Sequence, residues 1–479
     1  MEKKHRGLSV WELTMMALGT VIGGSFFLGS SVAIHAVGPL IIISYVLGGI
    51  LVYFILSALS EMTVADPAPG SFRTFAGKAF GPGAGFIVGW VYWTGMVLAM
   101  SSEAAAVSIL LRKWFPGISI SLFGSMTILA VTLLNLLGAN KLSKLESGLA
   151  AVKLLTIISF IIIALLLISG FLGVSPRTGT AKVTGEPLLL GGVKSIAGSM
   201  LTVMFAYAGF EIIGLAASET DNPKKIIPKA ISYTVISLVG LYIASISALL
   251  LLIPTGVLSE NFSPMVAALN RWGMNWAGNV INIVMVTAIL STMLAAMFGI
   301  GRMIRSLADE SYAPRWLKDR TKVPYRGMVF SGFVMFLGLM LGLLFPRVYL
   351  FLVSCGGFAL LFTYVTIVAS QIRLRKKHTY GAEGRHHIYV SWITLISLII
   401  VIASMPFIPG QASGLIAGLI IIAFYSVVYM CMKYYIKIKT YGISGNQFNV
   451  KRHNASFFTE FSKELIEKKK KTIQRYKGK

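Results

Sequence analysis

Long uninterrupted apolar runs constrain the fold of this chain more than any other feature of its sequence. Five of them, at 41–59, 150–173, 230–253, 390–405 and 414–432, come close to twenty residues or exceed it. An α-helix needs about 20 apolar residues to cross the hydrocarbon core of a bilayer, which is about 30 Å thick. Hydrophobic residues make up 56% of the chain and charged residues 13%, against about 45–50% and about 25% in soluble domains. The sequence therefore predicts an all-α membrane protein rather than a soluble fold.

Hydropathy divides the chain into twelve predicted transmembrane helices. They lie at about 10–34, 39–60, 83–110, 118–138, 146–171, 194–217, 230–253, 278–301, 327–345, 349–371, 389–407 and 412–433. A polar segment of 46 residues, 434–479, follows the last span and contains a run of four lysines at 468–471. We interpret this tail as a solvated, basic cytoplasmic segment; the alternative is a basic helix on anionic lipid.

Lysine and arginine concentrate in alternate loops between these spans, as the positive-inside rule predicts. With a cytoplasmic N-terminus, the inner loops hold dense sets within 302–326 and 373–385 together with Lys3, Lys4, Arg6, Arg73, Lys78, Lys141, Lys144, Lys224, Lys225 and Lys229. The outer loops hold Arg112, Lys113, Arg177, Lys182, Arg271 and Arg347. This asymmetry predicts a multi-pass protein of the bacterial cytoplasmic (inner) membrane with both termini in the cytoplasm. It also accounts for the net charge of +25 without a nucleic-acid partner.

Two of the predicted spans contain a helix-weakening segment at mid-membrane depth. The first span carries GTVIGGS at 19–25, and the sixth carries FAYAGFE at 205–211. Each glycine costs a helix about 1 kcal/mol relative to alanine. Unwound backbone inside a membrane is tolerated only where it is buried in protein or lines a cavity. Paired interruptions five spans apart are typical of a transporter binding site built from two repeats; the alternative is close helix packing through small residues.

A broken helix offers free backbone groups that suit a zwitterion. The N–H groups and positive dipole at one helix end can hold a carboxylate without a charged side chain. Carbonyl groups freed at the other break can hold an ammonium group. The paired breaks therefore predict binding of an amino acid.

Several motifs in chain order resemble those of a known transporter family. They are GTVIGGSFF at 19–27, IHAVGP at 34–39, ALSEM at 58–62, GWVYW at 89–93, SEA at 102–104, FAYAGFE at 205–211, SETDNPKKIIP at 218–228 and RM at 302–303. Together they resemble the amino acid permeases of the amino acid–polyamine–organocation superfamily, in its bacterial amino acid transporter branch. The resemblance implies the leucine-transporter fold, a 5+5 inverted repeat with two extra helices. The parts are then 1–9, the repeats 10–173 and 194–371, the last two spans 389–433, and the tail 434–479.

The resemblance also implies a function and a site. It implies proton-coupled uptake of an amino acid by alternating access, with Gly23, Gly24 and Ser25 receiving the substrate carboxylate and Phe205 closing over the substrate. Ser25 departs from the glycine that often stands there in the family. The predicted substrate site is completed by five further residues of the two broken segments, Thr20, Ala206, Tyr207, Ala208 and Gly209.

Three ionisable residues stand out within the predicted spans, where charge is costly and usually functional. Lys153 is placed to gain and lose a proton during transport. The resemblance implies that it replaces a bound sodium ion and faces the first break and the hydroxyls of Ser291 and Thr292. Snorkelling to the interface is the alternative for Lys153. Glu211 and Glu103 are further candidates for proton coupling, with structural hydrogen bonding as the alternative for each.

Other function classes lack their motifs. The sequence contains no GxxxxGK[ST] phosphate loop and no HExxH or other metal-ligand pattern, so we expect no cofactor, no metal and no enzymatic activity. The residues near the breaks are apolar or aromatic, which favours a neutral, branched-chain or aromatic amino acid. The expected partners are this substrate, protons and membrane lipid. An amino acid exchanger and an amino acid-sensing membrane receptor subunit remain alternatives, and the oligomeric state stays open.

Overall fold

A computed structural model describes residues 8–66, 68, 70–137, 139–173, 192–216, 220, 222–258, 263–319, 323–345, 347–376, 386–408 and 410–442. Within these ranges the chain forms helices and connecting segments, and no strand occurs. The helices are α1 (Val10–Val21), α2 (Gly24–Phe27), α3 (Gly29–Val37), α4 (Ile41–Ala65), α5 (Phe72–Phe80), α6 (Pro82–Leu111), α7 (Ile120–Asn135), α8 (Ala139–Ile168), α9 (Val193–Ala206), α10 (Ile212–Leu215), α11 (Pro223–Leu252), α12 (Pro264–Arg271), α13 (Asn275–Asp309), α14 (Tyr325–Gly342), α15 (Val348–Lys376), α16 (His386–Ser404) and α17 (Ala412–Gly442). Short 3₁₀ turns are η2 (Thr255–Val257), η3 (Arg315–Leu317) and η4 (Met405–Phe407).

The chain separates into two compact units, 1–426 and 427–479. The packing described below concerns the first unit. The predicted tail beyond 442 lies outside the described residues.

The prediction of a multi-span helical membrane protein is confirmed. Among the described residues, nine helices are long and apolar enough to cross a bilayer, namely α4, α6, α8, α11, α13, α14, α15, α16 and α17. A tenth span is the bent pair formed by α1 with the 24–37 segment, which turns by 52° at its break. Two further predicted spans, the fourth and the sixth, correspond to the shorter apolar helices α7 and α9.

Several helices extend beyond their predicted bounds. α13 continues to Asp309, eight residues past the predicted end, and α11 begins at Pro223, seven residues before the predicted start. Hydropathy detects only the part of a helix that matches the apolar thickness of the bilayer. The added turns are polar and lie outside that thickness, so the sequence pattern did not include them. The loop after α4 contains the short helix α5.

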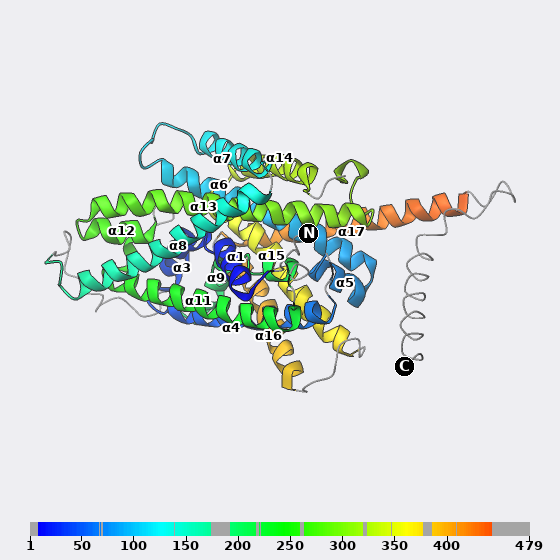
Figure 1. The fold of residues 1–479 in the computed structure, drawn as a ribbon, viewed down its shortest axis with the longest axis horizontal. Coiled ribbons are helices and arrows are strands. Elements are labelled where there is room, and N and C mark those ends of the chain that lie inside the picture. The colour runs from blue at the N-terminus through cyan, green and yellow to red at the C-terminus, as the bar shows by residue number, and fades with distance from the viewer. Residues whose placement is uncertain are drawn as a thin grey trace, which may run out of the picture. The chain divides into compact units, whose positions relative to one another are not determined.

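The two interrupted helices lie inside a bundle of longer ones. α6 and α15 are the most enclosed spans, with 78% and 89% of their apolar windows buried, and they pack on each other. α1 packs on α8, α11 and α13, while α9 packs on α3, α4 and α15. Figure 1 shows α1, α3 and α9 between the long helices α13 and α11. This arrangement surrounds both broken segments with protein.

Candidate functional site

The first span is interrupted at Ile22 and Gly23. The backbone there is extended, with φ −76° and ψ 100° at Ile22 and φ −143° and ψ −161° at Gly23. A helix resumes at Gly24 after this break. The first N–H groups of the new helical turn therefore lack intrahelical partners. The predicted break in the first span is confirmed.

The sixth span is interrupted from Tyr207 to Glu211, between α9 and α10. Gly209 adopts φ +108°, a backbone conformation that side chains with a Cβ rarely adopt. The predicted break in the sixth span is thus also confirmed. The two breaks lie against each other, because a Cβ added to Gly209 would stand 3.0 Å from the Thr20 carbonyl oxygen.

Gly209→Ala is therefore expected to destabilise the protein by about 1–2 kcal/mol or more, since it adds left-handed backbone strain to a clash with the Thr20 backbone. Thermal unfolding in one detergent measures the effect. Gly240→Ala is the matched control, because no heavy atom lies within 4 Å of the added Cβ in the middle of α11. Equal stability of the two variants would contradict close packing of the breaks.

Glu103 of α6 occupies the free N–H groups at the first break. The Gly24 N–H donates to Glu103 Oε2 at 2.8 Å, and the Ser25 N–H donates to Oε1 at 3.2 Å. A carboxylate is thus held by the backbone groups that the sequence predicted would receive one. This carboxylate belongs to the protein itself. Sequence reasoning gave Glu103 a proton-relay or structural role and did not find this contact, because 79 positions separate the partners.

Lys153 of α8 holds the carbonyl side of the same break. Its Nζ donates to the Gly19 carbonyl at 2.6 Å and to Thr292 Oγ1 of α13 at 2.8 Å. Thr292 Oγ1 also lies 2.9 Å from the Ile22 carbonyl. Lys153 is 1% exposed, so snorkelling to the interface does not describe it. The predicted contacts with the break and with Thr292 are confirmed.

Glu211 ties the second break to two other spans. Its carboxylate accepts the Gly209 N–H at 3.1 Å, the Tyr92 hydroxyl of α6 at 3.2 Å and the Tyr364 hydroxyl of α15 at 3.3 Å. These contacts give Glu211 the structural hydrogen bonding considered from sequence. Neither Tyr92 nor Tyr364 was among the predicted site residues. The GWVYW motif was the sequence feature that could have identified Tyr92 as a site residue.

The predicted aromatic site residues take different places. Phe205, in the last turn of α9, is buried and lies beside Gly357 of α15. Tyr207 instead donates its hydroxyl to the Tyr45 carbonyl at 3.0 Å, and its ring packs on Tyr45 and Tyr242. Its contacts are those of a packing residue that joins the break to α4 and α11.

The other predicted site residues contribute backbone. The Ala206 carbonyl accepts the Tyr242 hydroxyl at 3.0 Å, and the Ala208 N–H bonds back to the Phe205 carbonyl at 3.1 Å. The Thr20 hydroxyl donates to the Met16 carbonyl at 2.8 Å within α1. The structure therefore gathers these residues around the two breaks through main-chain groups rather than through polar side chains.

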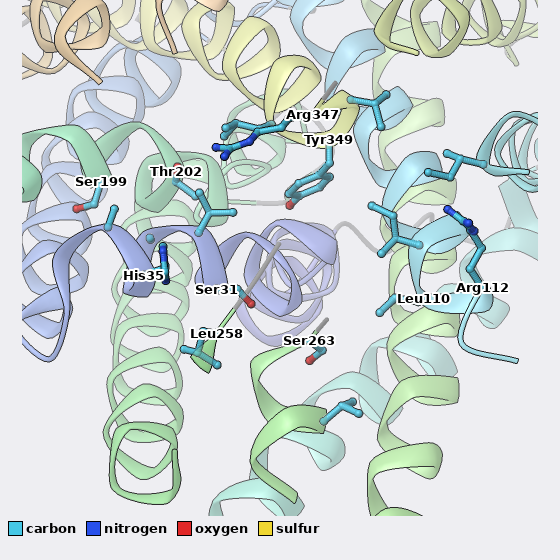
Figure 2. Close-up of a pocket in the computed structure, with 18 of the residues that line it drawn as sticks. Ser31, His35, Leu110, Arg112, Ser199, Thr202, Leu258, Ser263, Arg347 and Tyr349 are labelled. Carbon is cyan, nitrogen blue, oxygen red and sulfur yellow. The ribbon is translucent and has the colours of Figure 1, made fainter. Parts of the chain in front are cut away.

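A cavity of about 960 Å³ lies beyond the first break, toward the end of the bundle that carries His35 and Arg347. Figure 2 shows Tyr349 of α15 with its ring directed toward the broken first span. The Tyr349 hydroxyl lies 3.4 Å from the Gly24 carbonyl oxygen and also lines the cavity. Tyr349 therefore contacts both the cavity and the break. Tyr349 was not among the predicted site residues, since an aromatic residue at a span end usually belongs to the interfacial belt.

The polar groups on the two sides of the first break form a small buried site. Two N–H donors meet a carboxylate at one helix end, and a buried ammonium meets two oxygens at the other. No cluster of three or more His, Cys, Asp or Glu side chains suited to a metal ion occurs within the described ranges. The arrangement thus pairs a carboxylate with free backbone N–H groups at one helix end and a buried lysine with a backbone carbonyl and a hydroxyl at the other.

Comparison with known proteins agrees with this geometry. The model of the family described as "Amino acid permease" matches residues 12–444. A γ-aminobutyric acid permease of Bacillus subtilis (strain 168) is 32% identical over 432 residues, covering 87% of this chain and 92% of that protein. A γ-aminobutyric acid permease of Escherichia coli (strain K12) is 32% identical, covering 86% and 91%, and the amino-acid permease RocC of Bacillus subtilis is 29% identical, covering 90% and 94%. The chain thus belongs to the amino acid permease family of multi-pass membrane transporters, which are not enzymes.

Proposed function

We propose that this permease is a secondary active importer that couples proton entry to uptake of a neutral amino acid by alternating access. The observation that carries the proposal is the first break, where Gly24 and Ser25 hold a carboxylate and Lys153 holds the carbonyl side. The proposed fold is the twelve-span leucine-transporter fold. The nine long helices, the bent first span, α7, and α9 with α10 supply those twelve spans.

In this fold the two breaks occupy equivalent places in two inverted repeats, 10–173 and 194–371. The last two spans, 389–433, follow the repeats, and 1–9 and 434–479 are the proposed cytoplasmic ends. The first and sixth spans are the equivalent spans of a 5+5 repeat, and each is interrupted near its middle. Contact between Gly209 and Thr20 across the repeats supports one shared site.

In the proposed substrate site, the carboxylate of the amino acid binds at Gly23, Gly24 and Ser25. Its ammonium group lies toward carbonyls freed at the second break, within 205–209, and Phe205 closes over the side chain. The carboxylate of Glu103 already holds the same N–H donors. The substrate must therefore displace Glu103, because two carboxylate anions do not share one pair of donors without strong repulsion.

Displacement of Glu103 couples substrate binding to the uptake of a proton. A carboxylate released from two N–H donors inside the bundle loses their stabilisation, and taking up a proton removes the cost of an unpaired buried charge. Lys153 responds to the same event, since it holds Gly19 and, through Thr292, Ile22 on the other side of the break. Glu211 holds the second break in place while the first break changes its conformation. We assign proton coupling to Glu103 and Lys153, with Glu211 in a supporting position.

The proposed orientation places both termini in the cytoplasm of a bacterial inner membrane. The 960 Å³ cavity then opens to the outside, and the opposite end is closed by paired charges. There Arg73 of α5, 1% exposed, pairs with Glu310 and donates to Ser306 Oγ at 2.9 Å. Arg375 and Gln371 of α15 bind Glu61 of α4 at the same end. These pairs form the inner closure of an outward-facing state.

The substrate class is proposed from the lining of the breaks. Besides Glu103, the side chains of Ile289 and Tyr349 contact Gly24. Two relatives are named for γ-aminobutyric acid, which carries one ammonium and one carboxylate group and no net charge. Both observations favour a substrate of zero net charge.

Purified protein in proteoliposomes tests this function. A panel of the twenty protein amino acids and γ-aminobutyric acid is screened by thermal shift, and each binder is then assayed for uptake with an inward pH gradient. A one-unit gradient stores about 1.4 kcal/mol per proton and supports about tenfold accumulation. Accumulation that collapses with a protonophore supports the proposal. Counterflow without accumulation would identify an exchanger, and binding without transport would identify a sensor.

A further inference from the structure

A hollow distinct from the cavity beside Tyr349 lies between α7 and α14. Its volume is about 670 Å³. Leu136 at the end of α7 lines it together with Val329, Phe330 and Phe333 of α14, so its walls are apolar and aromatic. Figure 1 shows α7 and α14 side by side, and the two helices pack on each other. Val329 and Phe333 are exposed, which means that the hollow opens on the outer surface of the bundle.

Trp316 of η3 forms the wall near the start of α14. Its ring meets the ring of Phe330 edge-on, with 5.5 Å between the centroids, and Phe330 in turn stacks on Trp93 of α6. Arg326 Nη1 donates to the Trp316 carbonyl at 2.9 Å. These contacts fix η3 against α14, so the hollow is a built feature of the fold.

The hollow lies at the level of the inner leaflet, because α14 begins at the cytoplasmic side in the proposed orientation. Trp316 suits that level, since the amphipathic rings of Trp and Tyr gather at the membrane–water interface. Further along α14, Phe336 and Leu337 are also exposed and apolar. Water has few hydrogen-bond partners on such a lining, whereas an acyl chain fills it with van der Waals contacts. The lining therefore fits the hydrocarbon chain of a lipid.

Basic side chains gather at the mouth of this hollow. Arg326 is part of its lining. The Lys318 carbonyl lies 3.5 Å from Arg326 Nη1, which places Lys318 beside it, and Arg315 is the first residue of η3. All three residues are exposed. An apolar groove with a basic mouth matches the two parts of an anionic lipid.

Nearby acidic residues do not cancel this charge. Asp319 accepts the Arg326 backbone N–H at 3.1 Å, and its Oδ1 lies 4.0 Å from Arg326 Nε. Asp309 lies 3.6 Å from Lys318 Nζ, in an exposed pair of a kind that contributes little. Across 302–326 the sequence has seven Lys and Arg against three Asp and Glu. The positive-inside rule accounts for basic residues in an inner loop, but it does not account for the apolar hollow beside them.

We propose that this hollow binds one phospholipid with an anionic headgroup from the inner leaflet. One acyl chain lies between α7 and α14 along Val329 and Phe333. The phosphate meets Arg315, Lys318 and Arg326 through charge-assisted hydrogen bonds. Each basic residue near a membrane surface favours an anionic over a neutral lipid about fivefold. The site does not depend on the proposed transport function.

Quenching of tryptophan fluorescence by brominated lipid measures the occupancy of this hollow. The protein is placed in phosphatidylcholine vesicles with a rising fraction of dibrominated phosphatidylglycerol or of dibrominated phosphatidylcholine. The contribution of Trp316 is obtained by subtracting the signal of the Trp316→Phe variant. We expect it to show at least a tenfold preference for phosphatidylglycerol. Trp276, exposed at the start of α13 and not part of the lining, is isolated in the same way and is expected to show a ratio near one.

Removal of charge tests the headgroup contacts. The double variant Arg315→Gln and Lys318→Gln is expected to lower the preference at Trp316 at least fivefold. The matched control is Lys224→Gln with Lys225→Gln, which removes the same charge at two exposed positions at the start of α11. This control is expected to keep the wild-type preference.

Narrowing of the hollow tests the chain contacts while every charge stays in place. Val329→Phe is expected to weaken quenching of Trp316 by phosphatidylglycerol. Ile236→Phe introduces the same side chain at an exposed position of α11 and is expected to have no effect. Equal preference at Trp316 and Trp276, or a preference that survives the charge-removing double variant, would overturn the proposal. A preference that Val329→Phe leaves unchanged would also overturn it, because a basic surface then attracts lipid without a built site.

Discussion

Lys153→Ala is expected to abolish uphill accumulation and to leave substrate exchange intact. The buried ammonium of Lys153 joins the Gly19 carbonyl of the first span to Thr292 of α13. Alanine removes one of the two groups to which proton coupling at the break is assigned. Without coupling, a transporter only equilibrates its substrate, so the internal-to-external ratio falls from about ten under a one-unit pH gradient to about one.

Two further variants separate coupling from folding. Lys153→Arg keeps the positive charge but holds its proton permanently, so it is expected to bind substrate and also fail to accumulate it. Lys229→Ala, at an exposed position of α11, is expected to behave as the wild type. Counterflow by Lys153→Ala shows that the variant is folded. Full accumulation by that variant would remove Lys153 from the mechanism.

Glu103→Gln is expected to eliminate the pH dependence of substrate affinity. In the wild type, binding requires a protonated, displaced Glu103, so KM falls as the pH falls. Above the pKa of Glu103 it rises about tenfold per pH unit. Glutamine has nearly the same size but takes up no proton, and its NH₂ group opposes one of the two N–H donors of Gly24 and Ser25. The variant is expected to bind with a KM that does not change with pH and to lose proton-driven accumulation.

The control for this substitution is Asp309→Asn, which neutralises a half-exposed carboxylate at the end of α13. It is expected to retain the pH profile of the wild type. The profile of KM against pH between 5 and 8 in proteoliposomes distinguishes Glu103→Gln from Asp309→Asn. A Glu103→Gln protein with the wild-type slope would show that the proton binds elsewhere.

The sequence predicted the local features of this protein well. Long apolar runs identified the spanning helices, since the thickness of the bilayer sets their length. The glycines at 19–24 and at 209 identified the breaks, because loss of helix propensity acts within a turn or two. The ends of α11 and α13 were not predicted, as polar helical turns beyond the membrane carry no hydropathy signal.

The partners of the buried charges were partly predictable. Resemblance to the family implied that Lys153 would face the first break and Thr292, and the structure confirms those contacts. The attachment of Glu103 to Gly24 and Ser25 was missed, as were the Tyr364 hydroxyl on Glu211 and the position of Tyr349. Each of these contacts joins different spans, and no periodicity within one span encodes it.

By itself, therefore, the sequence determined that the chain crosses the membrane many times, where two of its helices open, and to which family it belongs. Only the tertiary structure decided that the opened N–H groups hold the protein's own Glu103, and that Arg112, Lys113 and Arg347 surround one cavity. The physical reason is that helix formation and membrane insertion depend on neighbouring residues. Lys153 and Gly19, by contrast, meet across 134 positions only after the helices have packed.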